Sequence, residues 1–212
     1  MADYDVIIAG GGLAGTIAAQ SVSHYSNQGL KILVIDRNPS NLPGMKSIAG
    51  WVCGDAVSKE AVDFMSNRIK VNWSEPEIEH KVKGVMAFSP DRETSIPFDG
   101  AGYMLNRQVL PQRQNERTLA MGVDFDFEIN LTGLLYDGNQ VVGVQGIDYK
   151  TKTPYKKTAK VVIDATGMTS MLRNQISNTT KMERKVDRKD VESTGRHIMH
   201  FDQGEEDLTE FD

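Results

Sequence analysis

Three glycines near the start of the chain have the spacing of a phosphate-binding loop. Gly10, Gly12 and Gly15 form a GxGxxG pattern between the run DVIIA, which is apolar after its first residue, and a stretch of helical periodicity. In such a turn the first glycine permits the tight bend, the second lets a pyrophosphate approach the backbone, and the third lets helix and strand pack closely. We therefore expect a dinucleotide phosphate at the helix N-terminus, near the backbone amides of Leu13 and Ala14.

An acidic residue follows at the end of the next apolar run. The segment KILVIDR places Asp36 and Arg37 directly after a predicted buried strand. A carboxylate at this place accepts hydrogen bonds from ribose hydroxyl groups in dinucleotide sites. The strand, glycine turn, helix and acid together predict a Rossmann-like nucleotide-binding unit, and the alternative is a glycine turn that binds no ligand.

The elements that must position these residues begin as a parallel βαβ unit. Ala14, Ala18, Val22 and Tyr25 recur at helical spacing and predict the buried stripe of the helix. The parallel pattern is then interrupted by a long loop, short strands and a predicted helix over residues 107–121. Three strand candidates with turn residues between them follow and predict an antiparallel meander, after which VVIDATG resumes as a buried strand.

These elements predict an α/β fold: a Rossmann-like domain with an antiparallel β-meander insertion and the start of an α+β substrate domain. We place the first domain at residues 1–177, with residues 70–104 contributing to the substrate domain, which resumes at 178–212. The acid-rich end predicts a chain that stops partway through the second domain, and the alternative is a natural acidic tail. Pro111 lacks a backbone N–H, so the predicted helix around it begins late or bends.

Composition excludes several classes of protein. A net charge of −5 argues against a nucleic-acid partner, since no basic field faces the phosphates. The start of the chain lacks a signal peptide and no apolar run is long enough to span a membrane, so we expect a cytoplasmic protein and leave a peripheral membrane contact open. The lone Cys53 cannot form an internal disulfide, and His197 and His200 lack a third ligand, so we expect no metal site.

The interruption of the parallel pattern bears on which dinucleotide is bound. A long insertion before the DATG strand resembles the FAD-binding flavoproteins of the hydroxylase and glutathione-reductase type. In that group the ATG turn lies close to the dinucleotide. The resemblance implies FAD as the cofactor, with Asp164, Thr166 and Gly167 facing it or lying just behind it, and the alternative is a plain turn at a strand end.

Five motifs narrow the resemblance. DYDVIIAGGGLAG, ILVIDR, CGDAVSK, LNR and VVIDATG, in this order and spacing, resemble the geranylgeranyl reductase family, including its archaeal members. The resemblance implies an FAD-dependent oxidoreductase that reduces isoprenoid double bonds of lipids, with ferredoxin or NAD(P)H as the electron donor. By position it implies cofactor contacts at Ala14, Asp36, Cys53, Gly54, Ala56, Arg107 and Leu131.

Within that family resemblance, two residues are catalytic candidates. A thiol has a pKa near ~8.5 and is mostly protonated at neutral pH, so Cys53 is a candidate donor of the proton that must accompany hydride transfer to an alkene. Asp55 is a candidate proton relay. The alternatives are a packed small hydrophobe for Cys53, a loop-bracing hydrogen bond for Asp55 and a solvated helix-start cation for Arg107.

Two other functions remain open on the sequence. A flavin-dependent monooxygenase or halogenase of the same fold would use oxygen chemistry, although CGDAVSK argues against it. An inactive FAD-binding module would bind the cofactor without turnover. The family is roughly twice as long as this chain, so we expect an N-terminal portion whose isolated activity is low or absent.

Overall fold

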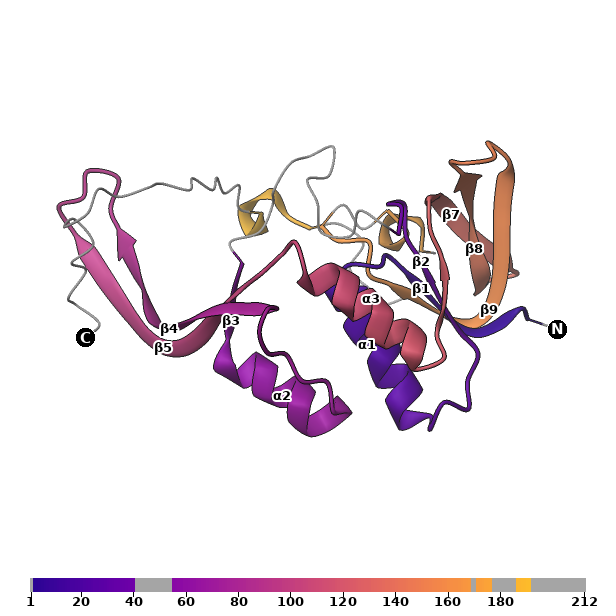
Figure 1. The fold of residues 1–212 in the computed structure, drawn as a ribbon. Helices are drawn as coiled ribbons and strands as arrows, with labels where there is room; N and C mark the ends of the chain where they lie inside the picture. Colours follow the sequence, from indigo (N-terminus) through magenta and orange to yellow (C-terminus); the bar gives the residue numbers. More distant parts are fainter. Residues whose placement is uncertain (1, 41–54, 169–170, 177–185, 192–212) are drawn as a thin grey trace. The chain divides into compact units, whose positions relative to one another are not determined.

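The computed structural model describes residues 2–40, 55–168, 171–176 and 186–191. These residues form two compact units (Figure 1). The first unit joins Met1–Met45 to Pro111–Glu192, and the described part of the second lies within Lys46–Leu110. The second unit therefore interrupts the first over a longer span than the expected 70–104, and the expected boundary at 177 falls on a residue outside the described ranges.

Six strands form the frame of the first unit: β1 (Tyr4–Ala9), β2 (Ile32–Ile35), β6 (Asp124–Asp126), β7 (Ile129–Asp137), β8 (Gln140–Asp148) and β9 (Pro154–Asp164). They lie in the order β6-β2-β1-β9-β8-β7. The end of β9 pairs in parallel with β1, and its beginning pairs antiparallel with β8. The predicted α/β class with an antiparallel meander is confirmed.

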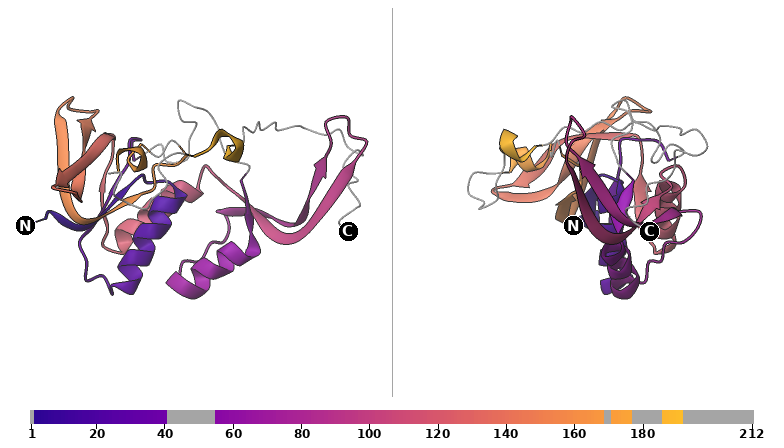
Figure 2. Two further views of the ribbon diagram at one scale, coloured as in Figure 1. Left: turned by 180° about the vertical axis from the view of Figure 1, so that it is seen from behind. Right: turned by 90° about the vertical axis from the view of Figure 1, so that its left-hand side faces the viewer.

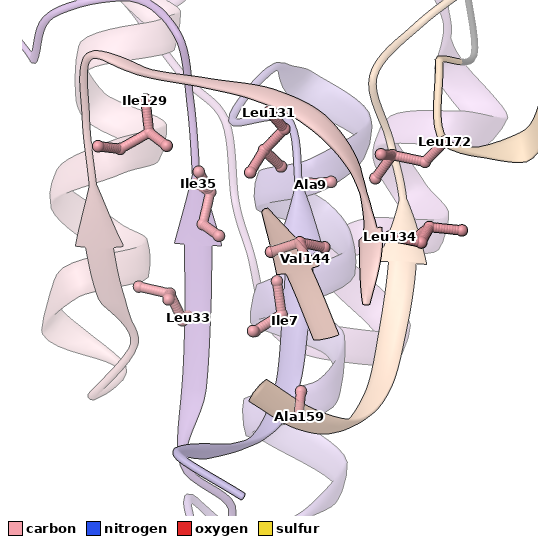
Figure 3. Packing of buried hydrophobic residues seen from close by; sticks show 10 residues of the cluster. All are labelled: Ile7, Ala9, Leu33, Ile35, Ile129, Leu131, Leu134, Val144, Ala159 and Leu172. Atoms are coloured by element: carbon pink, nitrogen blue, oxygen red, sulfur yellow. The ribbon is translucent and has the colours of Figure 1, made fainter. Parts of the chain in front are cut away.

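The parallel strands have a core on each face. Ile7 packs with meander residues such as Val144, and the side chains of this cluster gather over the strands in Figure 3. Ile8, its neighbour along β1, packs on the other face with Ala19 of helix α1 (Leu13–Tyr25). Successive side chains of a strand point to opposite faces, so a strand covered on both sides must be apolar throughout. That is why VIIA of β1 and ILVI of β2 are unbroken apolar runs.

The buried face of α1 differs from the predicted stripe. Ala14 is exposed and Tyr25 is 65% exposed, so the prediction was wrong at both ends of the helix. The side-chain amide of Gln20 donates to the hydroxyl of Thr118 at 2.8 Å on helix α3 (Leu110–Ala120). Polar side chains are buried where a partner satisfies them, and apolar periodicity alone does not reveal them. The buried residues of α1 are Gly15, Thr16, Ala19, Gln20 and Ser23.

Helix α3 begins later than residue 107. Its first residue is Leu110, so Pro111 lies in the first turn. The missing N–H of proline costs little there, because first-turn amides have no partner within the helix. Of the two expectations for Pro111, the late start is the one that the structure shows. Two short 3-10 helices, at Arg173–Gln175 and Arg188–Asp190, complete the described part of this unit.

The second unit is a three-stranded sheet with one helix. Its elements are β3 (Ala56–Ser58), α2 (Lys59–Ile69), β4 (Ile78–Phe88) and β5 (Ser95–Leu105). The strand order is β3-β5-β4, all antiparallel, and the long β4–β5 hairpin can be followed in Figure 2. The Ser58 hydroxyl caps α2 by accepting the N–H of Ala61 at 3.2 Å. Val62 and Met65 form the buried side of α2.

Two tyrosines tie strands of the first unit together through carboxylates. The hydroxyl of Tyr155, on β9, donates to Asp126 of β6 at 2.5 Å. The hydroxyl of Tyr4, on β1, donates to Asp124 at 3.2 Å. Neither β9 nor β1 is a neighbour of β6 in the sheet, so these side chains connect strands that share no backbone hydrogen bonds.

Replacing Tyr155 by phenylalanine tests the first connection. Removing the hydroxyl leaves the partly buried Asp126 without that donor, so we expect the free energy of unfolding to fall by about 1–3 kcal/mol. Urea unfolding followed by circular dichroism measures it. Tyr149→Phe is the control, because Tyr149 is exposed and its ring contact with Lys152 survives the change. Equal stability of wild type and Tyr155→Phe would contradict the assignment.

The same tyrosines make stability depend on alkaline pH. Burial, ahead of the nearby Asp124 charge, raises the pKa of Tyr4 to about 12, and burial ahead of the Asp126 hydrogen bond raises the pKa of Tyr155. The folded state then keeps protons that the unfolded chain loses above pH ~10, so stability falls as the pH rises past that value. We expect the urea midpoint to drop less between pH 10 and 12 in a Tyr4→Phe/Tyr155→Phe variant than in wild type. If the urea midpoints of wild type and variant fall equally, other titrating groups dominate the loss of stability at alkaline pH.

Candidate functional site

The glycine turn after β1 is crowded by backbone. Gly10 has a φ of +102°, which a side chain rarely tolerates, and its N–H donates to the carbonyl of Ile35 at 2.8 Å. A Cβ on Gly10 would lie 2.3 Å from the carbonyl oxygen of Ala165. The carboxyl ends of β1, β2 and β9 therefore meet at this residue.

Gly15 and Gly12 have opposite surroundings. A Cβ on Gly15 would lie 1.8 Å from the carbonyl oxygen of Gly10, so only glycine lets α1 pack this closely on the turn. A Cβ on Gly12 would meet nothing within 4 Å. Gly12 is the N-cap of α1, and the first turn of α1 contains no acidic residue. The positive end of the helix dipole is thus open to an anion.

Asp36 connects the glycine turn to the exit of β2. One carboxylate oxygen accepts the N–H of Gly11 at 2.6 Å, and the other accepts the N–H of Asn38 at 2.7 Å. Each carboxylate oxygen can accept more than one hydrogen bond, so both keep capacity for hydroxyl donors. The backbone fixes the orientation of this acid before any ligand arrives.

A cavity of about 280 Å³ lies at this place. The backbone after β6 reaches it because the N–H of Ile129 donates to the carbonyl of Asp36 at 3.0 Å. Six residues that the sequence predicted as cofactor-binding line the cavity: Gly10, Gly12, Asp36, Arg37, Leu131 and Gly167. The other lining residues are Ile35, Asn38, Ile129, Asn130, Ala165, Thr166, Met171 and Leu172.

Sequence motifs pointed to some of the other lining residues, and no motif pointed to the rest. Thr166 was expected near the cofactor with its DATG neighbours, and Ala165 belongs to the same turn. Asn130 adjoins Leu131 and could have been found with it. Met171 and Leu172 reach the cavity through the loop after β9, and no sequence pattern marks that loop as a wall.

Four predicted residues of this unit do not line the cavity: Leu13, Ala14, Gly15 and Asp164. Leu13 and Ala14 belong to the first turn of α1, and Gly15 is buried beneath it. The Asp164 carboxylate accepts hydrogen bonds from the backbone of Thr166 and of Arg173, both at 3.0 Å, and from the Thr166 hydroxyl. Asp164 therefore braces the loop that forms one wall, and its contact with a cofactor remains a prediction.

The remaining predicted residues belong to the second unit or lie outside the described ranges. Asp55 is buried, and its carboxylate is 3.6 Å from Nε of Arg107. Ala56 is exposed and pairs with Met104. The sequence singled out Asp55 and Arg107 separately, and the fold brings them together. Cys53 and Gly54 lie outside the described residues, so their roles remain predictions.

The residues of the cavity suit a dinucleotide. Open glycine backbone at the positive end of α1 matches a diphosphate, and a carboxylate held by two backbone amides matches ribose hydroxyls.

Within the described part of the chain, no three His, Cys, Asp or Glu side chains gather to hold a metal. No helix of that part is long and apolar enough to cross a membrane.

Comparisons with known proteins agree with this geometry. The family model described as "FAD dependent oxidoreductase" matches residues 5–197. A digeranylgeranylglycerophospholipid reductase from Sulfolobus acidocaldarius is 32% identical over 92% of this chain, and one from Methanocella arvoryzae is 27% identical over 93%. The chain spans 41% and 46% of the lengths of these two relatives.

Solved structures show the same fold. A geranylgeranyl bacteriochlorophyll reductase-like protein from Thermoplasma acidophilum superposes with a TM-score of 0.63 at 25% identity, over 80% of this chain and 41% of that one. A flavin-dependent brominase superposes with a TM-score of 0.59 at 20% identity, over 78% of this chain and 38% of that one. The brominase likeness concerns the fold alone.

Two alanine variants separate packing from binding at the glycine turn. Gly15→Ala forces a Cβ into the Gly10 carbonyl, so we expect the free energy of unfolding to fall by about 3 kcal/mol or more. Gly12→Ala meets open space, so we expect a stability change within ~0.5 kcal/mol together with at least tenfold weaker dinucleotide binding. Urea unfolding and quenching of flavin fluorescence measure the two effects. Unchanged dinucleotide affinity in Gly12→Ala would remove the phosphate from this turn.

Proposed function

The chain belongs to the FAD dependent oxidoreductase family, and from this premise we propose that it supplies the FAD-binding part of an enzyme that reduces isoprenoid double bonds of lipids. The observation that carries the proposal is the cavity over the glycine turn, with Asp36 held ready by two amides. The substrate class comes from the reductases that are similar along nearly the whole chain.

Different cavity residues would bind different parts of FAD. The backbone of Gly12 and the first amides of α1 would bind the diphosphate, and Asp36 would accept hydrogen bonds from the adenosine ribose. The backbone at Asn130 and Leu131 would meet the adenine edge, since both residues line the cavity. Arg37 is exposed at the rim and would add positive charge near the phosphates.

Reduction of an isolated alkene needs two partners. The double bond has no carbonyl to receive charge, so simple hydride attack is slow and a proton must arrive as well. Reduced FAD supplies the hydride when it is bound. We keep Cys53 as the proposed proton donor, because a thiol is largely protonated at neutral pH and tolerates an apolar pocket. Exclusion of water by the surrounding residues would protect the reaction from side routes.

The proposed partners follow from this chemistry. An isoprenoid lipid is the substrate, and ferredoxin or NAD(P)H is the electron donor that reduces FAD. The lipid substrate of such an enzyme is embedded in a membrane, so we propose a cytoplasmic protein with a peripheral membrane contact. Oxygen chemistry of the monooxygenase or halogenase kind is the competing function, and its support is a shared fold.

Turnover by the whole protein tests the proposal. FAD is added, the flavin is reduced with dithionite without oxygen, and a geranylgeranyl lipid is supplied. We expect mass spectrometry to show gain of two hydrogens per reduced double bond. We expect Asp36→Asn, which keeps the shape but loses the charge, to weaken FAD binding about tenfold, as loss of a charge-assisted hydrogen bond would.

Two controls make the result decisive. Tyr149→Phe, which lies outside the cavity lining, should bind FAD and turn over as wild type does. Oxygen consumption by the reduced protein should not rise when the lipid is added. Substrate-stimulated oxygen uptake without hydrogenated product would favour the monooxygenase function, and failure of FAD to bind would overturn the proposal altogether.

A further inference from the structure

A short segment after β9, residues 171–176, supplies part of the cavity lining in the first unit. Met171 and Leu172 of this wall segment line the cavity, and so do Asn130 and Leu131 at the start of β7. Leu172 and Leu131 also belong to the same buried cluster (Figure 3). The width of the cavity between these two stretches therefore depends on how the wall segment is held against β7.

Strand β7 has a bulge directly after Leu131. Leu131 pairs with Gly146 of β8 and Gly133 pairs with Gln145, so Thr132 is an extra residue on β7. β7 is also the last strand of the sheet that the structure describes. An edge strand has backbone N–H and C=O groups that no further strand binds. The bulge therefore presents backbone groups to a side chain just beyond the cavity lining.

The side-chain amide of Gln175 binds on both sides of this bulge. Its nitrogen donates to the carbonyl of Thr132 at 2.9 Å, and its oxygen accepts the N–H of Leu134 at 3.3 Å. The amide thus bonds to β7 as a residue of a neighbouring strand does. Its nitrogen also donates to the carbonyl of Met171 at 3.2 Å, inside the wall segment. One side chain therefore connects the wall segment to β7.

Two further contacts fix the place of Gln175. The hydroxyl of Tyr136 donates to its backbone carbonyl at 2.8 Å. A Cβ on Gly133 would lie 3.0 Å from its Oε1, so the glycine leaves room for the amide. Gln175 is exposed, and water could satisfy its amide, so burial does not force these hydrogen bonds. Their consequence is that the wall segment lies at one place along β7.

The wall segment has a second anchor at the end of β9. The carboxylate of Asp164 accepts the N–H of Arg173 at 3.0 Å. Gln175 and Asp164 thus hold the segment from two different strands. The residues between and beside these anchors have little freedom to move toward or away from β7.

We infer that Gln175 is a positioning residue that sets the width of the cavity at the place where a planar ring is received. The inference rests on the proposed function, in which the backbone at Asn130 and Leu131 meets the adenine edge of FAD. Met171 and Leu172 then form an apolar wall against the ring, and Gln175 holds this wall at a fixed distance from β7. A wall that is ordered before binding lowers the cost of binding.

Calorimetric titration of the whole protein with ADP tests the inference, because ADP carries the adenine ring and the diphosphate of FAD. Gln175→Met keeps the length of the side chain and removes its hydrogen bonds. We expect this variant to bind ADP about fivefold more weakly than wild type, because the wall must then be ordered on binding. Tyr136→Phe removes one contact and keeps the amide, so its ADP affinity should fall between those of wild type and Gln175→Met.

Gln112→Met is the matched control. Gln112 is an exposed glutamine of the same unit, its amide donates to Glu116 at 3.2 Å, and it does not line the cavity. This variant should bind ADP as wild type does. Equal ADP affinity in wild type and Gln175→Met would overturn the inference.

Inorganic pyrophosphate separates positioning from general damage to the fold. Pyrophosphate has no ring and would occupy the glycine turn, so Gln175→Met should bind it as wild type does. In lipid reduction, the FAD concentration that gives half the maximal rate should rise about fivefold in Gln175→Met, with the maximal rate unchanged. Equal losses of affinity for ADP and pyrophosphate, or a fall in the maximal rate alone, would show that Gln175 has a merely structural role.

The same measurements separate this inference from the proposed function. If the protein reduces the lipid and neither ADP nor FAD binding depends on Gln175, the inference fails and the proposed function stands. If ADP affinity depends on Gln175 and no lipid is reduced, the proposed function fails and the inference stands. If wild type binds no ADP, the inference is wrong.

Discussion

Close approach of backbone to backbone at the carboxyl ends of β1 and β9 constrains the whole first unit. Gly10 faces the Ala165 carbonyl and Gly15 faces the Gly10 carbonyl at distances that no side chain permits. This crowding brings α1 down onto the sheet and leaves Gly12 open in front of the helix N-terminus. The cavity exists because the turn is tight on its inner side and open on its outer side.

Charge at the site is arranged by the backbone. The N-terminal end of α1 has free backbone amide donors, and its first turn contains no acidic residue. The carboxylate of Asp36 is turned toward Gly11 and Asn38, whose amides hold both of its oxygens. Amide donors suited to an anion and carboxylate acceptors suited to hydroxyl groups therefore lie close together at this site. Such preorganisation lowers the cost of ordering the site on binding.

In the second unit, the fold likewise holds two charged side chains in place. Asp55 and Arg107 are far apart in sequence and become neighbours because β3 pairs with the end of β5. The pair is buried, so its partners compensate each other and fix each other's geometry. In the first unit the backbone orients an acid, and in the second the side chains of an acid and a guanidinium lie against each other.

Local rules of residue type and spacing predict several parts of this protein. Apolar runs predicted β1 and β2, and the spacing of the glycines predicted the turn between β1 and α1. Asp36 was predicted as a site residue because it directly follows a strand. Other features depend on contacts between residues that are distant in sequence. The side-chain amide nitrogen of Gln20 is buried where it donates to Thr118. Tyr155 reaches Asp126 across the unit, and Met171 and Leu172 line the cavity through a loop that no pattern marks. Periodicity reports which residues avoid water, whereas hydrogen-bond partners distant in sequence decide which polar residues can also be buried.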